Sequence, residues 1–404
     1  MATEHANVAA GGALDRSVPS TATRWASRTQ FFCAGFIFAT WGVHIPTVKA
    51  HYGIDEAQLG LALLAAGVGA LLGISQAGRV IGRHGARLVC GLCGTVYALL
   101  LTGLIAMPGL IGLLALLVLF GLVTSVFDVA INTEAAQLEM RGGQPLMSGM
   151  HGMFSLGGMA GALTGGAAIA AGLPPQHHLW LVAGAMLVAV ALATTRMLPG
   201  AVTATERGPG GGTDGFRLPR GALAVLGTLA ALGLIAEGAI YDWSVLYLQQ
   251  ELGSPQQQAA LAYGSFSAAM AAARFGGDAL RHRFEPAVLV RGSALLAAVS
   301  MTLVLLTSSP WVALAGFAGV GIGFANVVPI LFAASARVPD VAPAQGIASV
   351  SAVAYLGFMT GPPVIGFLAR IGSLTLALFV VVAFALALAL AARHANPAKV
   401  EAKA

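Results

Sequence analysis

Long apolar runs, separated by short stretches rich in Pro, Gly and charge, dominate the chain. Runs such as residues 88–107 and 374–392 have about 20 mostly apolar residues, the length that crosses a bilayer as a helix. Hydropathy and turn residues together predict twelve transmembrane helices. Their approximate ranges are 26–48, 56–81, 87–107, 110–138, 146–171, 178–197, 220–250, 257–281, 287–307, 311–336, 343–370 and 373–393. The pattern therefore predicts an all-α, polytopic membrane protein.

The predicted spans fall into two groups of six. Between them, residues 198–219 are rich in Gly and Pro with scattered charge, which is typical of a flexible linker. We therefore expect an N-terminal six-helix bundle over 25–197 and a C-terminal one over 220–393. Residues 1–24 lack the apolar run of a cleaved signal peptide and are predicted to form a disordered cytoplasmic tail. Residues 394–404 are predicted to be a second cytoplasmic tail.

The two groups of spans resemble each other at a shift of 200 residues. Gly121 falls on Gly321, and the segment 155–161 falls on 355–361 with both glycines of a G-x-x-x-G pattern matched. Two parallel repeats of this kind, related by an axis along the membrane normal, are found in secondary transporters.

Composition supports the membrane prediction. The chain is 57% hydrophobic and 9% charged, whereas soluble domains have about 25% charged residues. The net charge of +5 does not indicate nucleic-acid binding, because of where the cations lie. With both termini cytoplasmic, 19 of the 21 Lys and Arg, Arg274 among them, fall on the cytoplasmic side, and only Lys49 and Arg370 fall on the other. This asymmetry is the usual topology signal of membrane proteins.

Carboxylates inside the spans are candidates for proton coupling. Asp128 and Asn132 are four residues apart and so share one helical face. An ionised side chain at membrane depth costs at least about 2.5–3.5 kcal/mol, so it should face protein or water. Asp128, Glu237 and Asp242 are therefore predicted to bind protons, with Glu237 ranked above Asp242 because it lies deeper in its span. The alternative for Asp128 is a hydrogen bond that locks neighbouring helices.

Polar and aromatic side chains in the same spans are candidates for binding a solute. Trp41 and Tyr241 occupy equivalent positions in the repeat, and aromatic faces suit a sugar or another flat-faced molecule. The candidate substrate-binding residues are Trp41, His44, Asn132, His151, Tyr241, Trp243 and Asn326. Aromatic packing or an interfacial belt remains an alternative for the tryptophans. Met147, Met150 and His151 leave open a Cu(I)-binding face, although we expect no metal site.

A loop motif links the chain to a known family. "GRVIGRHGAR" (78–87) is similar to the loop between helices 2 and 3 of the major facilitator superfamily, with Gly82 where that family has Asp. "GGDALRHRF" (276–284) resembles the counterpart loop in the second half and keeps its acid. The resemblance implies charge pairs that hold the halves together when the cavity opens outward, and ordinary positive-inside charge is the alternative. The implied gating residues are Gly78, Arg83, Arg87, Asp278 and Arg283.

Other segments resemble a narrower group. Residues 127–132, 237–248 and 325–332 look like the YbjJ-like branch of bacterial inner-membrane proteins, which are distant relatives of fucose permease. The resemblance implies two pseudo-symmetric six-helix bundles around a central cavity in the bacterial inner membrane. It also implies acids on the first and fourth helices, and the first span of this chain has none.

These observations favour one class of function. None of the three lysines lies in a phosphate-binding loop, so ATP is not expected to drive the protein. No nucleophile with a base stands out, so we expect neither an enzyme nor a cofactor. The expected function is a secondary active transporter that moves a small polar solute, sugar-like by preference, by alternating access coupled to protons. Drug or metabolite efflux, Cu(I) transport and a non-transporting receptor remain alternatives. The expected partners are the solute, protons and membrane lipid, with no nucleic acid, and the chain is expected to be a monomer.

Overall fold

The computed structural model describes residues 19–143, 146–199, 220–339, 341 and 343–396, and this part of the chain forms helices and no strands. The all-α prediction is confirmed. The helices are α1 (Thr21–Tyr52), α2 (Glu56–His84), α3 (Ala86–Leu100), η1 (Leu101–Gly103), α4 (Gly109–Gly142), α5 (Met147–Ala170), α6 (Pro175–Arg196), α8 (Ala222–Gln250), α9 (Gln256–Arg283), α10 (Pro286–Leu306), α11 (Pro310–Phe324), α12 (Val327–Ser335), α13 (Pro343–Ile371), α14 (Leu374–Ala391) and η2 (Ala392–Ala395).

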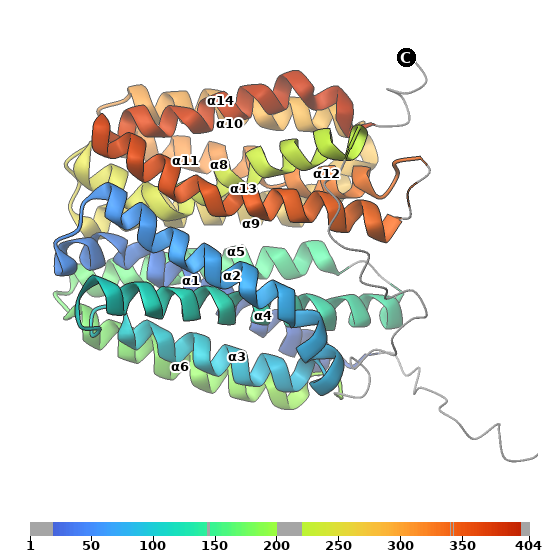
Figure 1. Cartoon of the computed structure of the whole chain (residues 1–404), viewed down its shortest axis with the longest axis horizontal. Helices are drawn as coiled ribbons and strands as arrows, with labels where there is room; N and C mark the ends of the chain where they lie inside the picture. The colour runs from blue at the N-terminus through green and yellow to red at the C-terminus, as the bar shows by residue number, and fades with distance from the viewer. Residues whose placement is uncertain (1–18, 144–145, 200–219, 340, 342, 397–404) are drawn as a thin grey trace, which may run out of the picture.

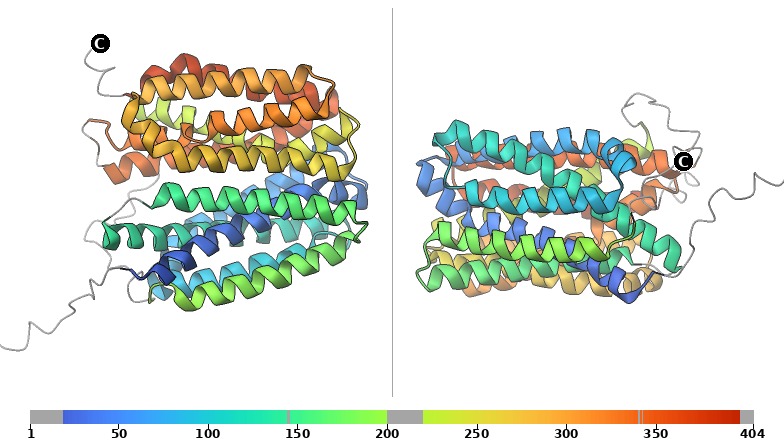
Figure 2. Two further views of the ribbon diagram at one scale, coloured as in Figure 1. Left: turned by 180° about the vertical axis from the view of Figure 1, so that it is seen from behind. Right: turned by 90° about the horizontal axis from the view of Figure 1, so that it is seen from below.

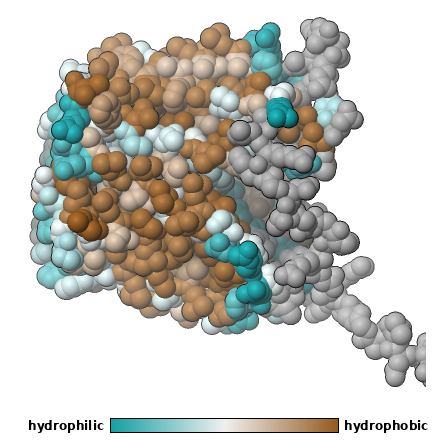
Figure 3. Space-filling view, viewed as in Figure 1, coloured by the Kyte–Doolittle hydropathy of each residue, from teal (hydrophilic) through white to brown (hydrophobic). Residues whose placement is uncertain are grey.

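Most of these helices are long and apolar enough to cross a membrane. Eleven candidate spans meet both criteria among the described residues, with η1 continuing α3, and with α11 and α12 forming one span interrupted at Ala325–Asn326. The helix α9 has 28 residues and is equally long, but its polar side chains keep it out of this set. The surface shows a broad hydrophobic belt with hydrophilic residues at both ends (Figure 3). This is the pattern expected of a protein surrounded by lipid at its middle.

The helices form two groups that lie side by side (Figure 1). We call α1–α6 the N-half and α8–α14 the C-half. The end at which α6 stops and α8 starts is the linker end, and the opposite end is the distal end. The described residues exclude most of the predicted tails and of the linker, namely residues 1–18, 200–219 and 397–404. The domain boundaries placed there stay predictions.

The internal repeat is also visible in the packing. In the N-half, α4 approaches α2 so closely at Gly121 that a Cβ there would collide with the carbonyl oxygen of Ala66. In the C-half, α11 approaches α9 at Gly321 in the same way, against the carbonyl oxygen of Phe266. Both the glycines and their partners are 200 residues apart, so the two halves repeat a contact as well as a sequence pattern. Glycine permits such close approach of membrane helices.

Two helix pairs carry most of the contact between the halves. The N-half helix α2 packs against α13, and α5 packs against α9, whereas α1 contacts α8 and α9 at the centre. Figure 1 shows α2 beside α13, and the view from behind in Figure 2 shows α5 beside α9. Polar groups on these helices therefore meet between the halves.

Local chemistry fixes the distal turn that joins α1 to α2. Gly53 has φ of 61°, a left-handed conformation that ends α1 and that glycine adopts without strain. Asp55 then caps α2, since its Oδ1 accepts from the Gln58 backbone N–H at 2.8 Å and Gln58 Oε1 accepts from the Asp55 N–H at 3.0 Å. The turn holds Asp55 and Glu56 at the distal surface of the N-half.

Candidate functional site

Arg274 on α9 connects charged and polar groups from both halves. Its guanidinium donates to Glu237 Oε1 of α8 at 3.0 Å and to Ser155 Oγ of α5 at 2.9 Å. Ser148 Oγ of α5 in turn donates to the Arg274 carbonyl oxygen at 3.0 Å. The side chains of Arg274 and Glu237 are 13% and 12% exposed, so water screens this ion pair only partly. Arg274 thus pairs with an acid of its own half and ties that half to the other.

Tyr355 on α13 extends this network to the fourth span. It interacts electrostatically with both Asp128 of α4 and Glu237 of α8. Asn132 Nδ2 donates to Asp128 Oδ1 at 3.1 Å and to the Asp128 carbonyl oxygen at 2.8 Å, so the predicted shared face of α4 is confirmed. His151 of α5 interacts electrostatically with Arg274. We call these residues of α4, α5, α8, α9 and α13 the inner cluster: Asp128, Asn132, His151, Ser155, Glu237, Arg274 and Tyr355.

Several inner-cluster side chains are accessible although they lie between the halves. Tyr355 is 37% exposed, His151 is exposed, and Asp128 and Asn132 are partly exposed. A helix rises about 1.5 Å per residue, so His151 lies about 6 Å, and Tyr355 about 18 Å, from the linker-end starts of α5 and α13. These accessible side chains therefore lie at different depths below the linker end.

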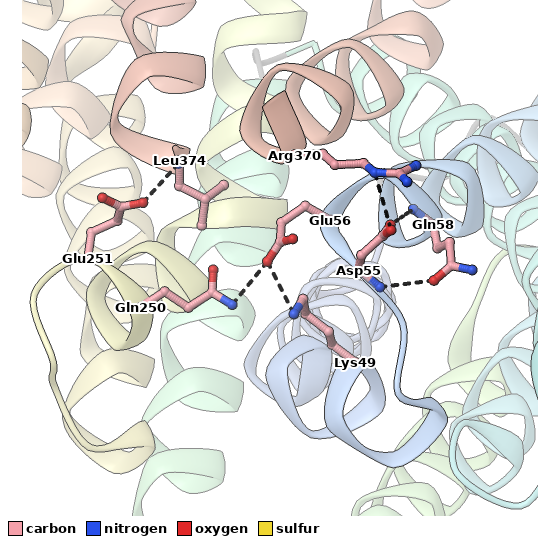
Figure 4. Close-up of polar contacts among 8 residues, drawn as sticks. All are labelled: Lys49, Asp55, Glu56, Gln58, Gln250, Glu251, Arg370 and Leu374. Atoms are coloured by element: carbon pink, nitrogen blue, oxygen red, sulfur yellow. Dashed lines mark hydrogen bonds and ion pairs between the residues drawn. The ribbon is translucent and has the colours of Figure 1, made fainter. Parts of the chain in front are cut away.

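Polar contacts close the distal end (Figure 4). Glu56 Oε1 of α2 lies 3.1 Å from Lys49 Nζ and accepts a hydrogen bond from Gln250 Nε2 of the C-half at 3.2 Å. Arg370 Nε of the C-half lies 3.5 Å from Asp55 Oδ2 of the N-half. We call these five residues the distal seal, because two of its three contacts join the halves.

Closer packing lies behind the distal seal. A Cβ on Gly60 of α2 would lie 3.0 Å from the carbonyl oxygen of Pro362 on α13. Gln256 Nε2 at the start of α9 donates to Thr47 Oγ1 at 2.8 Å and to the Val43 carbonyl oxygen at 3.1 Å, both on α1. The halves are thus held together at the distal end by backbone packing as well as by side chains.

The three acids predicted to couple protons lie in different surroundings. Asp128 is partly exposed in the inner cluster, and no cation pairs with it among the described residues. Glu237 is bound by Arg274. Asp242 is 7% exposed, interacts electrostatically with Tyr263, and has no ion pair in the described part of the chain. The coupling roles of these acids stay predictions.

The two aromatic residues at equivalent repeat positions do not meet. Trp41 is 2% exposed, and its ring centroid lies 6.3 Å from that of Phe120 inside the N-half. Tyr241 contacts Phe38 of α1 edge-on at 5.7 Å. Among the described residues, the aromatic residue of α1 that contacts Tyr241 is therefore Phe38, three positions before Trp41.

Trp243 and Asn326 lie in packed regions outside the inner cluster. Trp243 is fully buried, and a Cβ on Gly366 of α13 would lie 3.2 Å from its ring. Asn326 stands at the break between α11 and α12, and its Nδ2 donates to the Ala273 carbonyl oxygen of α9 at 3.4 Å. Asn326 therefore holds the broken span against the residue before Arg274.

The two candidate histidines are separated. His151 belongs to the inner cluster and contacts Phe31 edge-on at 5.5 Å. His44 is 1% exposed near the distal end, and its Nε2 lies 2.9 Å from His178 Nδ1. Met150 is fully buried while His151 is exposed, so these two side chains do not share an open face. No group of three His, Cys, Asp or Glu residues placed to hold a metal occurs among the described residues.

The gating residues implied by the loop motif form no ion pair between the halves in the described part of the chain. Arg83 and Arg283 are exposed at the linker end, and a Cβ on Gly78 would meet no atom within 4 Å. Arg87 donates to the Thr195 carbonyl oxygen of α6 at 3.1 Å, which is a contact within the N-half. Asp278 lies in α9, and its side chain is outside the described part.

Sequence reasoning missed important residues of both sites. It counted Arg274 with the cations of the cytoplasmic side, whereas the structure places Arg274 inside α9, nine residues before the helix ends. It did not select Tyr355, an isolated tyrosine in a run of small residues. Lys49 and Arg370 were seen only as exceptions to the charge asymmetry, and both belong to the distal seal. The two cations predicted on the non-cytoplasmic side could therefore have indicated the distal seal from the sequence alone.

Two pseudo-symmetric helical bundles with accessible polar groups between them define a membrane transport protein of the two-bundle class. The family model described as Major Facilitator Superfamily matches residues 29–348. An uncharacterised MFS-type transporter of Yersinia pestis is 33% identical over 378 residues, which cover 93% of this chain and 96% of that protein. The chain belongs to the major facilitator superfamily, as the loop motif indicated.

Solved structures show the same fold at low sequence identity. The nucleoside transporter NupG superposes with a TM-score of 0.70 at 16% identity, covering 93% of this chain and 98% of that one. A D-xylose–proton symporter superposes with a TM-score of 0.71 at 12% identity, covering 91% and 96%. At these identities the likeness establishes the fold.

Proposed function

We propose that the protein is a proton-coupled secondary transporter that carries a small polar solute, sugar-like by preference, through the inner cluster by alternating access. The observation that carries the proposal is the position of Arg274, which pairs with Glu237 of the C-half and donates to Ser155 of the N-half beside the accessible Tyr355. The hydroxyl, carboxylate, amide and guanidinium groups of the inner cluster can donate to and accept from a polyhydroxyl solute. The proposed locale is the bacterial inner membrane, with the linker end cytoplasmic.

In this proposal the structure represents the state open to the cytoplasm. The distal seal blocks the periplasmic side, while inner-cluster side chains remain accessible on the linker side. The implied gating arginines at the linker end, Arg83 and Arg283, are exposed, as expected when that end is open. Opening the distal end requires the contacts of Asp55 and Glu56 with the C-half to break.

We assign proton binding first to Asp128. A proton on Glu237 would leave Arg274 as an unpaired cation, whereas a proton on Asp128 breaks no ion pair among the described residues. Arg274 then positions Glu237 as an acceptor for solute hydroxyl groups. Solved relatives in fold include a symporter that moves a sugar with protons, which supports this class of solute and coupling.

The experiment combines a binding screen with transport. Sugars, polyols and nucleosides are tested for thermal stabilisation of the purified protein, and any ligand is then used for uptake into proteoliposomes under an imposed pH gradient. We expect gradient-driven uptake to fall at least about tenfold in Asp128→Asn, while exchange of solute without a gradient persists. Tyr355→Phe should weaken solute binding.

Glu251→Gln is the matched control, because this acid caps α14 at the distal end, away from the inner cluster. Full gradient-driven uptake by Asp128→Asn would refute the coupling assignment. A ligand that binds the purified protein but is never exchanged would refute transport and favour a receptor.

A further inference from the structure

A pair of buried histidines lies beside the contacts that close the distal end. His44 of α1 and His178 of α6 are 1% and 5% exposed, and their ring nitrogens Nε2 and Nδ1 lie 2.9 Å apart. The ring centroids are 5.2 Å apart. His44 Nδ1 lies 3.4 Å from Thr47 Oγ1. The histidine pair therefore contacts Thr47, which accepts a hydrogen bond from Gln256 of the C-half.

These contacts form a chain that crosses from one half to the other. Gln256 Nε2 donates to Thr47 Oγ1 at 2.8 Å, Thr47 contacts His44, and His44 contacts His178. The other nitrogen of His178, Nε2, is buried and has no hydrogen-bond partner. A neutral pair can make these contacts with the protons pointing either way along the chain, because each neutral ring has one donor and one acceptor nitrogen.

An additional proton has no favourable place in this closed arrangement. In one arrangement Thr47 donates to His44 Nδ1, and His44 Nε2–H donates to His178 Nδ1. Both Nδ1 atoms then already accept a hydrogen bond, so a new proton on either of them breaks a contact. If the protons point the other way, the new proton enters at His178 Nε2, which is buried without a partner. In both cases a cation forms in a site sealed from water, which is costly unless a counter-charge is present.

The other elements packed against α1 and α6 bring one buried acid close to this depth, Asp242 of α8, and it makes no ion pair with either histidine. On α1, Lys49 is committed to Glu56 of α2, and on α6 the neighbouring His177 is exposed and contacts Trp180 at 5.5 Å. The helix α5 contributes Gly165, whose Cβ position lies 3.7 Å from the His178 ring, and α9 contributes the neutral Gln256. Among the described residues, no acid pairs with either histidine.

We propose that His44 and His178 form a proton-binding site of the distal end, and that binding a proton there favours separation of the halves at that end. The separation removes Gln256 from Thr47 and lets water reach the rings, so the open state hydrates the cation that the closed state cannot. This site is distinct from the inner cluster and does not depend on which solute the protein carries.

The direction of the effect follows from linkage. A state that binds a proton more tightly is favoured as pH falls, so acid should raise the ratio of distal-open to distal-closed molecules. One linked proton changes that ratio by at most about tenfold per pH unit. In a cell that exports protons, the acidic exterior would then increase the fraction of carrier molecules that are open to the outside.

The test measures this ratio directly in the full-length protein, and the probe is the proton alone. Ala50 and Ser308 are exposed at the distal ends of the N-half and C-half, so spin labels on Ala50→Cys and Ser308→Cys report the opening by pulsed EPR distances. The native cysteines Cys33, Cys90 and Cys93 are replaced by Ala. We expect the long-distance population to grow at least threefold between pH 8 and pH 5.

Three variants separate the histidine site from other causes. His178→Gln should abolish the pH response, and His177→Gln, its exposed neighbour, should keep it. Thr47→Val leaves both histidines in place and removes their connection to Gln256, so it too should reduce the response even if His178→Gln fails to fold. A response that is absent from the parent, or that folded His178→Gln keeps in full, would overturn the proposal; if His178→Gln does not fold, a full response in Thr47→Val would do so. Because no solute is used, this result is independent of the uptake experiment.

Discussion

The two halves of the protein share their backbone packing and differ in their charges. Gly121 and Gly321 make the same close contact 200 residues apart, and Ser155 and Tyr355, also 200 apart, both place a hydroxyl in the inner cluster. In contrast, Asp128 corresponds to the apolar Val328, which is 8% exposed.

The same contrast holds for the ion pair of the C-half. Glu237 corresponds to the fully buried Ile37, and Arg274 corresponds to Ile74. One half thus offers a neutralised acid–base pair, and the other offers an acid without a cationic partner among the described residues. The difference indicates that packing constrains both repeats alike, whereas the polar chemistry has been divided between them.

Breaking the ion pair of the C-half should give the largest effect. Arg274→Met leaves Glu237 as an unpaired, largely buried carboxylate, so we expect a loss of about 3–5 kcal/mol in stability. The apparent melting temperature of the detergent-solubilised protein measures this loss. The double variant Arg274→Met with Glu237→Gln should recover most of it, and Arg283→Met, exposed on the same helix, should change little. Equal stability of the single and double variants would contradict the pairing.

The shared packing can be tested by matched glycine substitutions. Gly121→Ala and Gly321→Ala each push a methyl group into a backbone carbonyl, so each should cost about 1–3 kcal/mol. The controls Gly184→Ala in α6 and Gly292→Ala in α10 place the methyl group in open space and should not lower the melting temperature. A large loss of stability in only one of the two variants would show that the helices do not approach equally closely in both halves.

The smallest effect is expected at the distal seal. Arg370 and Asp55 are 59% and 37% exposed as side chains, so their pair should contribute no more than about 1 kcal/mol. Asn at position 55 keeps the helix cap, which makes Asp55→Asn the suitable substitution. A double-mutant cycle with Arg370→Gln gives the coupling energy. A coupling well above about 1 kcal/mol would mean that this pair, rather than the packing behind it, closes the distal end.

The sequence was sufficient to predict the fold, because spans are defined locally. A stretch of about 20 apolar residues commits to a membrane helix regardless of its neighbours, and the 200-residue repeat supplied the two-half arrangement. The break at Ala325–Asn326 is a smaller feature that hydropathy does not resolve, since both sides of the break are equally apolar, but Pro329 indicates it locally because it cannot donate to the Ala325 carbonyl oxygen.

The site was harder to predict, because it depends on which faces of different helices meet. The Asp128–Asn132 face was predictable from a spacing of four residues along one helix. The pairing of Arg274 with Glu237 spans 37 positions, and nothing local distinguishes Arg274 from the arginines that follow at the linker end. Trp41 illustrates the same limit, because Phe38, three residues earlier and about 60° away around the helix axis, is the residue that contacts Tyr241.

The polarity of α9 has a consequence for how the chain is made. Among the described helices of spanning length, α9 alone is too polar to qualify as a membrane span by itself. During synthesis α8 emerges first, so the carboxylate of Glu237 enters lipid without its cation until Arg274 follows. We therefore expect the translocon to release α8 and α9 together as a helical hairpin. A nascent chain truncated between them should be retained in the translocon or degraded by membrane proteases.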